Sequence, residues 1–235
     1  MRKTLNIAQK ELQVLFRSSM AYILLIACLI IFHYFFFLIL DQNREATLRD
    51  MFQLMEFLFV FIIPLLTMKS FAEEKSTGTI EFLMTTPTTS GTLVLGKYLG
   101  NLLFFSFLLF LTFSYYCVLE YFGHPDRLSM LTGYAGIWLE AAFFIAIGNL
   151  CSSLTKNQVA AAMMSYVFLF GLYFSTTILK YLKGTAAEMV QIFGTSVHLA
   201  NFSDGLITTS DIVYYMSGIA VCLILTKLIL DFQKD

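Results

Sequence analysis

The first long apolar stretch of the chain, residues 20–40, reads MAYILLIACLIIFHYFFFLIL. These 21 residues contain no Lys, Arg, Asp or Glu. An α-helix rises 1.5 Å per residue, so the stretch is long enough to cross the roughly 30 Å of hydrocarbon in a bilayer. It exceeds the apolar region of a signal peptide and lacks a small-residue cleavage site. We therefore expect it to stay in the mature protein as a transmembrane helix.

Five further stretches of the same kind follow along the chain, at residues 52–68, 98–119, 131–151, 158–179 and 212–230. Of the 235 residues, 58% are apolar and only 13% are charged, whereas soluble domains carry about 25% charged residues. A helix is the form that satisfies its own backbone hydrogen bonds in lipid. The sequence thus predicts an all-α membrane protein, with residues 1–235 forming a single domain of six transmembrane helices.

Composition also excludes several functions. The 15 Lys and Arg residues nearly balance the 16 Asp and Glu residues, which leaves no basic stripe for nucleic acid. The four cysteines are far apart and have no zinc-ligand spacing, so no metal site is expected. The segments outside the spans contain no Ser, His and Asp constellation and no room for a soluble catalytic domain. We expect a protein that is not itself an enzyme.

Positive charges predict the orientation in the membrane. Ten Lys and Arg residues fall on the side of the two termini and five on the other side. Because cytoplasmic loops carry the excess of positive charge, both termini are expected in the cytoplasm, in a multi-pass protein of the plasma (inner) membrane. Residues 4–18 precede the first span and predict an interfacial helix. Its apolar face would consist of Leu5, Ala8, Leu12, Leu15 and Phe16.

The cytoplasmic loop predicted at residues 69–97 contains the run SFAEEKSTGTIEFLMTTP at residues 70–87. Ile80, Leu83 and Met84 share one helical face, and Pro87 would end the helix. Residues 88–90 can cap a further turn that leads to the third span. A short helix fixed at both ends to membrane helices can pass a push from a soluble partner to the spans. An ordinary loop helix packed on the membrane face remains the alternative.

A near match to a nucleotide-binding motif lies in the same region. Residues 91–97 satisfy G-x-x-x-x-G-K, but Tyr98 stands where the motif needs Ser or Thr for magnesium, and no buried strand precedes it. We therefore expect this chain to bind no cofactor, and any ATP and magnesium to be bound by a partner subunit. Gly96 and Gly100 instead form a G-x-x-x-G pair that would let a neighbouring helix approach closely.

Four further features of the sequence are the segments AQKEL at residues 8–12, EEKSTGTIEFLMTTP at 73–87, AIGNLCSSLTKNQ at 146–158, and NFSDGLITTSDIVYY at 201–215. In this order they resemble the ABC-2 type permeases, and the short chain is most similar to the gliding-motility-type and copper-processing-type branch. The resemblance implies the permease subunit of an exporter. It also implies a second permease chain, identical or homologous, and two copies of an ABC ATP-binding subunit.

The resemblance further implies roles for particular segments. It places the helix that couples the spans to the ATPase in the 69–97 loop, which carries Glu73, Glu74, Gly78, Thr79, Glu81, Leu83 and Pro87. It also places two short re-entrant helices before the last span. Within the outer region at residues 180–211, stretches 186–193 and 196–202 could supply them. The aromatic spans suit a lipid, a drug-like molecule or a polymer equally, so the sequence does not identify the transported substrate.

Two ionisable residues fall inside the predicted spans, Glu140 and His33. A charged carboxylate at this depth costs about 2.5–3.5 kcal/mol on insertion scales, so Glu140 must face protein or water, or carry a proton. We interpret both residues as candidates for the translocation path. The alternative for Glu140 is a carboxyl group hydrogen-bonded to a neighbouring helix, and the alternative for His33 is a neutral imidazole whose two nitrogens are satisfied locally. A proton-coupled secondary transporter using both residues is the second functional hypothesis, although the sequence lacks the repeated halves common in such proteins. Glu56 and Glu120, near outer span ends, are expected to be solvated.

Overall fold

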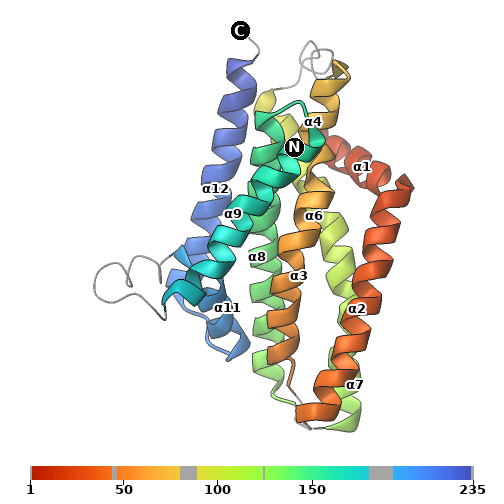
Figure 1. Cartoon of the computed structure of the whole chain (residues 1–235), viewed down its shortest axis with the longest axis vertical. Helices are drawn as coiled ribbons and strands as arrows, with labels where there is room; N and C mark the ends of the chain where they lie inside the picture. Colours follow the sequence, from red (N-terminus) through yellow and green to blue (C-terminus); the bar gives the residue numbers. More distant parts are fainter. Residues whose placement is uncertain (1, 44–46, 80–88, 124, 180–192, 234–235) are drawn as a thin grey trace.

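The computed structural model describes residues 2–43, 47–79, 89–123, 125–179 and 193–233. Within these ranges the regular elements are α-helices and there is no strand. The helices stand side by side in one elongated bundle (Figure 1). The predicted all-α fold is confirmed.

The described residues form ten helices. They are α1 (Arg2–Arg17), α2 (Ser19–Asn43), α3 (Arg49–Thr67), α4 (Lys69–Ser76), α6 (Ser90–Thr112), α7 (Ser114–Phe122), α8 (Arg127–Leu154), α9 (Gln158–Leu179), α11 (Thr195–Ser203) and α12 (Thr209–Phe232).

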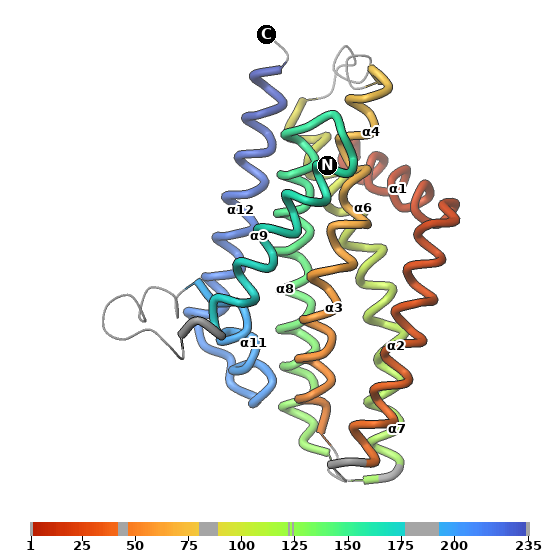
Figure 2. Tube along the Cα trace, viewed as in Figure 1, coloured from red at the N-terminus to blue at the C-terminus, as the bar shows by residue number. Residues whose placement is uncertain are grey.

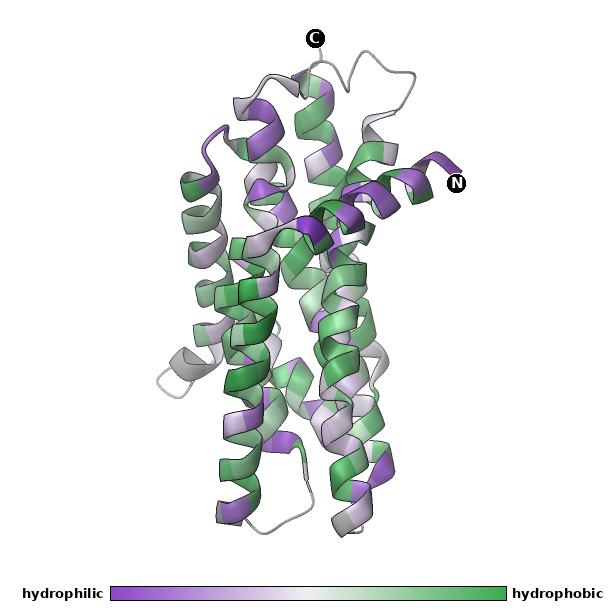
Figure 3. Cartoon of the chain, turned by 90° about the vertical axis from the view of Figure 1, so that its right-hand side faces the viewer, coloured by the Kyte–Doolittle hydropathy of each residue, from purple (hydrophilic) through white to green (hydrophobic). Residues whose placement is uncertain are grey.

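Six segments of the described chain are helical, long and apolar enough to cross a membrane, as the sequence predicts. They are α2, α3 with α4, α6 with α7, α8, α9 and α12. α1, α4 and the last turns of α12 lie at one end of the bundle, which we call the α4 end, and α7 lies at the opposite end (Figure 1). Hydrophilic residues gather on α1 and at the two ends, and hydrophobic residues cover the middle of the bundle (Figure 3).

Two helices extend beyond the apolar stretches that predicted them. α6 begins at Ser90 instead of residue 98, and Thr89 caps it by accepting a hydrogen bond from the Thr92 N–H at 3.3 Å. The predicted turn after residue 88 is therefore part of the span itself. α3 passes through Pro64 and ends at Thr67, and α4 follows after Met68 alone. Residues 69–76 and 90–97, assigned above to a loop, are thus helical extensions of two spans.

α8 is the central helix of the bundle. It contacts α3, α4, α6, α9, α11 and α12, and 72% of its span is buried, against 22% for α2, α9 and α12. Lipid tails are as apolar as Leu, so close packing rather than expulsion of water holds such helices together. Glycines on α8 permit that packing, because a Cβ at Gly133 would lie 2.1 Å from the ring of Phe52 and a Cβ at Gly136 would lie 2.5 Å from Phe202.

α11 lies part-way along the bundle, beside the end of α9 (Figure 2). Thr132 of α8 donates a hydrogen bond to the Phe202 carbonyl at 2.7 Å, which fixes α11 to the central helix. Asp211 of α12 accepts from Asn201 at 3.1 Å, and its carboxylate lies 2.6 Å from His198 Nδ1. A short helix is therefore present where residues 196–202 predicted one. Its predicted companion at residues 186–193 falls outside the described residues, except for Phe193.

Candidate functional site

The predicted coupling residues that the structure describes lie at the α4 end of the bundle. Glu73 and Glu74 are on α4, and Gly78 and Thr79 follow its last turn. The other three, Glu81, Leu83 and Pro87, belong to residues 80–88, which lie outside the described residues, as does the helix predicted there. The geometry around α4 shows how this segment is connected to the spans.

A buried lysine joins three helices at this end. Lys97 of α6 has a side chain that is only 2% exposed. Its Nζ lies 2.7 Å from Oε1 of Glu11 on α1 and 2.9 Å from Oε1 of Glu74 on α4. The ammonium group also lies 5.4 Å from the centre of the Phe71 ring. Lys97, the last residue of the G-x-x-x-x-G-K run, thus sits within a helix and is held by two carboxylates.

Two glycines allow α1 to lie close enough to α6 for this contact. A Cβ at Gly96 would lie 2.5 Å from Ile7, and a Cβ at Gly100 would lie 2.6 Å from the Cβ of Glu11 and 3.1 Å from the Ala8 carbonyl oxygen. Any side chain at these positions would push α1 away. The close approach predicted from the G-x-x-x-G pair is confirmed, and α1 is the neighbouring helix.

A serine of α8 occupies the break between α3 and α4. The Ser152 hydroxyl donates to the Met68 carbonyl at 2.9 Å and accepts from the N–H groups of Phe71 at 3.0 Å and Ala72 at 3.1 Å. In an unbroken helix the Ala72 N–H would bond the Met68 carbonyl, so the hydroxyl has entered the helical ladder. Lys75 Nζ in turn donates to the Ser153 carbonyl.

α4 ends in a tight cap. Gly78 has φ 72°, the left-handed conformation typical of the residue that follows a helix, and a Cβ there would meet nothing within 4 Å. Thr77 Oγ1 donates to the Glu73 carbonyl at 2.9 Å, and Thr79 Oγ1 donates to the Glu74 carbonyl at 3.3 Å. The chain therefore leaves α4 in a defined direction toward residues 80–88.

A cavity of about 290 Å³ lies between α1, α3, α4 and α6 beside the lysine. Its lining mixes lysines and glutamates with hydroxyl and amide side chains, and it contains Lys10, Glu11, Val14, Leu15, Ser18, Leu66, Lys69, Ser70, Glu73, Glu74, Thr77, Thr79, Lys97 and Asn101. In the described part of the chain, no group of three His, Cys, Asp or Glu residues could hold a metal ion. The contacts around the cavity connect α1, α4 and α6 mechanically.

The two residues predicted for the translocation path do not share a site. His33 of α2 is exposed on the bundle surface, with Nδ1 2.7 Å from the Leu29 carbonyl oxygen and 3.0 Å from the Tyr115 hydroxyl. Glu140 of α8 is completely buried and faces Glu56 of α3 instead. In the described structure Glu140 and His33 make no contact with each other, so a proton could not pass directly between them.

Glu56 is a residue that sequence reasoning misplaced. We expected it to be solvated near the end of its span, but its side chain is 2% exposed. α11 covers it, and both Thr195 and Ser196 donate their hydroxyls to its carboxylate. Nothing local in the sequence signals this burial, because the covering residues lie about 140 positions away. Glu120 fits the expectation better, since it is one-third exposed and paired with Arg127.

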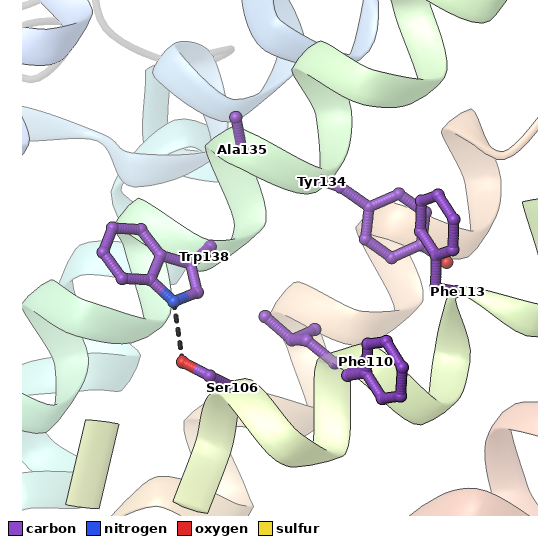
Figure 4. A pocket seen from close by; sticks show the side chains of 7 residues that line it. Ser106, Phe110, Phe113, Tyr134, Ala135 and Trp138 are labelled. Carbon is purple, nitrogen blue, oxygen red and sulfur yellow. Dashed lines mark hydrogen bonds between the residues drawn. The ribbon is translucent and has the colours of Figure 1, made fainter. Parts of the chain in front are cut away.

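An apolar groove of about 320 Å³ lies between α6 and α8 (Figure 4). Trp138 Nε1 donates a hydrogen bond to Ser106 Oγ at 2.9 Å across it, and aromatic rings form much of its wall. The groove is lined by Ser106, Leu109, Phe110, Phe113, Tyr134, Ala135 and Trp138. The lining residues carry no charge, and their polar groups are the Ser106 and Tyr134 hydroxyls and the Trp138 N–H.

A comparison with known protein families gives a match that covers nearly the whole chain. The family model described as ABC-2 family transporter protein matches residues 5–223. A search of curated protein sequences found no match. The matched region contains five of the six spans completely and most of the last, together with the Lys97 cluster and the Glu56–Glu140 pair. The chain therefore belongs to the ABC-2 transporter family, whose members are the membrane permease components of ABC transporters.

Proposed function

We propose that this chain is the permease subunit of an ATP-driven exporter, powered by a separate ATP-binding subunit that acts on the α4 end. The observation that carries the proposal is the buried Lys97 cluster, which ties α4 to both α1 and α6. A force applied to residues 80–88 would reach α4 and α6 directly, because these helices flank that segment. From α4 it would reach α8 through Ser152.

In this proposal two ATP-binding subunits hold ATP and magnesium and close on each other, and their motion shifts the spans between inward-facing and outward-facing states. A second permease chain, identical or homologous, completes the complex. The α4 end faces the cytoplasm of a plasma (inner) membrane, as the ten-to-five division of positive charges favours. The coupling residues would be those of α4 and its cap together with Glu81, Leu83 and Pro87.

Co-purification from native membranes in a mild detergent tests the partnership. The wild-type chain should carry an ATP-binding subunit with it. A variant whose residues 80–88 are replaced by a Gly-Ser linker of equal length should lose that subunit while all six spans stay inserted. If no ATP-binding subunit travels with the wild type, or if the linker variant retains it, the proposal is wrong.

Two further measurements test coupling and sidedness. Glu74→Gln should keep the complex intact but weaken the effect of the permease on its ATPase, whereas Glu120→Gln at the opposite end should leave that effect unchanged. In a background without other reactive cysteines, Thr79→Cys should react with a membrane-impermeant maleimide only after the cytoplasmic face is opened. Labelling of this cysteine in intact cells would place the α4 end outside and refute the proposed mechanism.

A further inference from the structure

The buried glutamates of α3 and α8 form a pair that the described structure leaves without a counter-ion. The carboxyl group of Glu56 lies against the first turn of α11, where Thr195 Oγ1 donates to it at 3.4 Å and Ser196 Oγ donates as well. The N-terminal end of a helix favours a negative charge. These contacts favour the charged form of the Glu56 carboxyl group, whereas its burial favours the neutral form.

Glu140 has the opposite surroundings. Its side chain is 0% exposed, and neither carboxyl oxygen makes a hydrogen bond of ordinary geometry with a described residue. It faces Glu56 and interacts with it electrostatically. Two carboxyl groups at such a site repel each other when both are charged, and burial raises the cost. The pair therefore needs either a proton on one of the two carboxyl groups or a positive charge beside them, and the described residues around it provide no positive charge.

The other titratable groups that interact with the pair are tyrosines of α9 and α12. Tyr173, Tyr214 and Tyr215 all interact electrostatically with Glu140. Two of these hydroxyls are committed elsewhere, because Tyr214 donates to the Phe193 carbonyl at 2.7 Å and Tyr215 donates to the Thr195 carbonyl at 3.3 Å. These tyrosines therefore supply no positive charge to the pair.

A cavity reaches this cluster. It has a volume of about 160 Å³ and is lined by Gln53, Glu56, Tyr173, Thr176, Ser196, Leu199, Ala200 and Ser203. At about 30 Å³ per water molecule it holds the volume of about five waters. This space exceeds what a bare metal ion needs and suits an ammonium group on a short carbon chain. None of the lining residues is positively charged.

We propose that Glu56, Glu140 and this cavity form a binding site for a small organic cation that carries an ammonium group. Glu56 would accept hydrogen bonds from the ammonium group, Glu140 would add negative charge from behind it, and the Tyr173 ring would add a cation–π contact. Glu56 is the one carboxylate among the residues that line the cavity, and no group of three His, Cys, Asp or Glu in the described part of the chain could hold a metal ion. Binding is inferred from this site alone; that the cation belongs to the transported molecule rests on the function proposed above.

The test uses the purified chain in detergent, without ATP or any ATPase, so that it can fail or succeed independently of the transport proposal. Dicyclohexylcarbodiimide, an apolar reagent for buried carboxyl groups, is added, and mass spectrometry measures the labelling rate at each glutamate. Butylammonium chloride is the probe, with sodium chloride at equal ionic strength and butanol as matched controls. Butylammonium should slow labelling of the pair about tenfold when its concentration is about ten times the dissociation constant.

Variants locate the effect. Glu56→Gln and Glu140→Gln should each leave the remaining carboxyl group reactive but abolish its protection by butylammonium, and Glu120→Gln should keep protection intact. Tyr173→Phe should keep protection and Tyr173→Leu should weaken it. The proposal would be overturned if butylammonium failed to slow labelling of the wild-type glutamates, or if sodium chloride or butanol slowed it equally. Both results come from the wild-type protein, so they hold even if a variant fails to fold. Absence of labelling at both glutamates would also overturn it, because the cavity would then not reach the pair.

Discussion

Replacement of Lys97 by methionine is the sharpest test of the cluster at the α4 end. The substitution keeps the length and apolar stem of the side chain and removes only its charge. It leaves the carboxylates of Glu11 and Glu74 facing each other, each with a side chain about 20% exposed. The second oxygen of Glu74 already lacks a hydrogen-bond partner among the described residues. Neither carboxylate then has a cation nearby in the cluster.

Removing one partner of a buried ion pair typically lowers the free energy of unfolding by about 3–5 kcal/mol. We expect a loss of about 3 kcal/mol for Lys97→Met, because both carboxylates retain some contact with water. For a chain of this size, that loss corresponds to a fall in melting temperature of about 6–12 °C. Thermal unfolding in detergent, followed by the fluorescence of the single tryptophan, Trp138, measures it. Lys227→Met removes an exposed lysine and should change stability by no more than about 0.5 kcal/mol.

The triple variant Lys97→Met, Glu11→Gln, Glu74→Gln separates charge from packing. It removes all three charges together, so no uncompensated carboxylate remains and most of the lost stability should return. A triple variant as unstable as Lys97→Met alone would show that the lysine acts through its packing. That result would refute the electrostatic reasoning.

Three smaller perturbations test the contacts around the cluster by the same melting assay. Gly100→Ala should lower the free energy of unfolding by about 1–3 kcal/mol, because the new Cβ would lie 2.6 Å from the Cβ of Glu11. Gly171→Ala is the control and should be neutral or stabilising, because a Cβ there would meet nothing within 4 Å. Equal effects of the two substitutions would contradict the close packing of α1 against α6. Ser152→Ala leaves two N–H groups of α4 without their acceptor and should cost about 1–3 kcal/mol, and an unchanged melting temperature would argue against its role in the helix break. Thr89→Ala removes the N-cap of α6 and should lower the free energy of unfolding by about 1 kcal/mol. Thr89→Ser keeps a capping hydroxyl and should preserve most of that stability.

Much of the fold was predictable because apolar length is a local property of sequence. The stretch at residues 158–179 coincides with α9, and residues 20–40 fall inside α2. The start of α6 was missed for a physical reason. Lys97 is a strong signal for the end of a span, and only its two carboxylate partners make its burial in a helix acceptable. Those partners lie 86 and 23 positions away, outside any local pattern.

The candidate site was predictable only where a local sequence pattern marks its residues. Glu74 could be identified from a family motif, but its partner Lys97 was visible only as part of a failed nucleotide-binding motif. Ser152 belongs to another motif of the family, yet its place inside the break between α3 and α4 depends on how α8 packs. Glu140 was found because a carboxyl group in a span is rare, and Glu56 was missed because its burial depends on α11.

The two sites are connected by the same pair of helices. Twelve residues separate Glu56 from Met68 on α3, and twelve separate Glu140 from Ser152 on α8. Each arm is thus about 18 Å long, and a tilt of α3 by about 10° at its break would move Glu56 by about 3 Å relative to Glu140 on the continuous α8. Between the ends, a Cβ at Gly148 would lie 2.1 Å from Thr67 Oγ1, so the two helices touch and have little room to slide. A push on α4 would therefore open or close the distance between the glutamates, and that distance sets how strongly they can hold a cation.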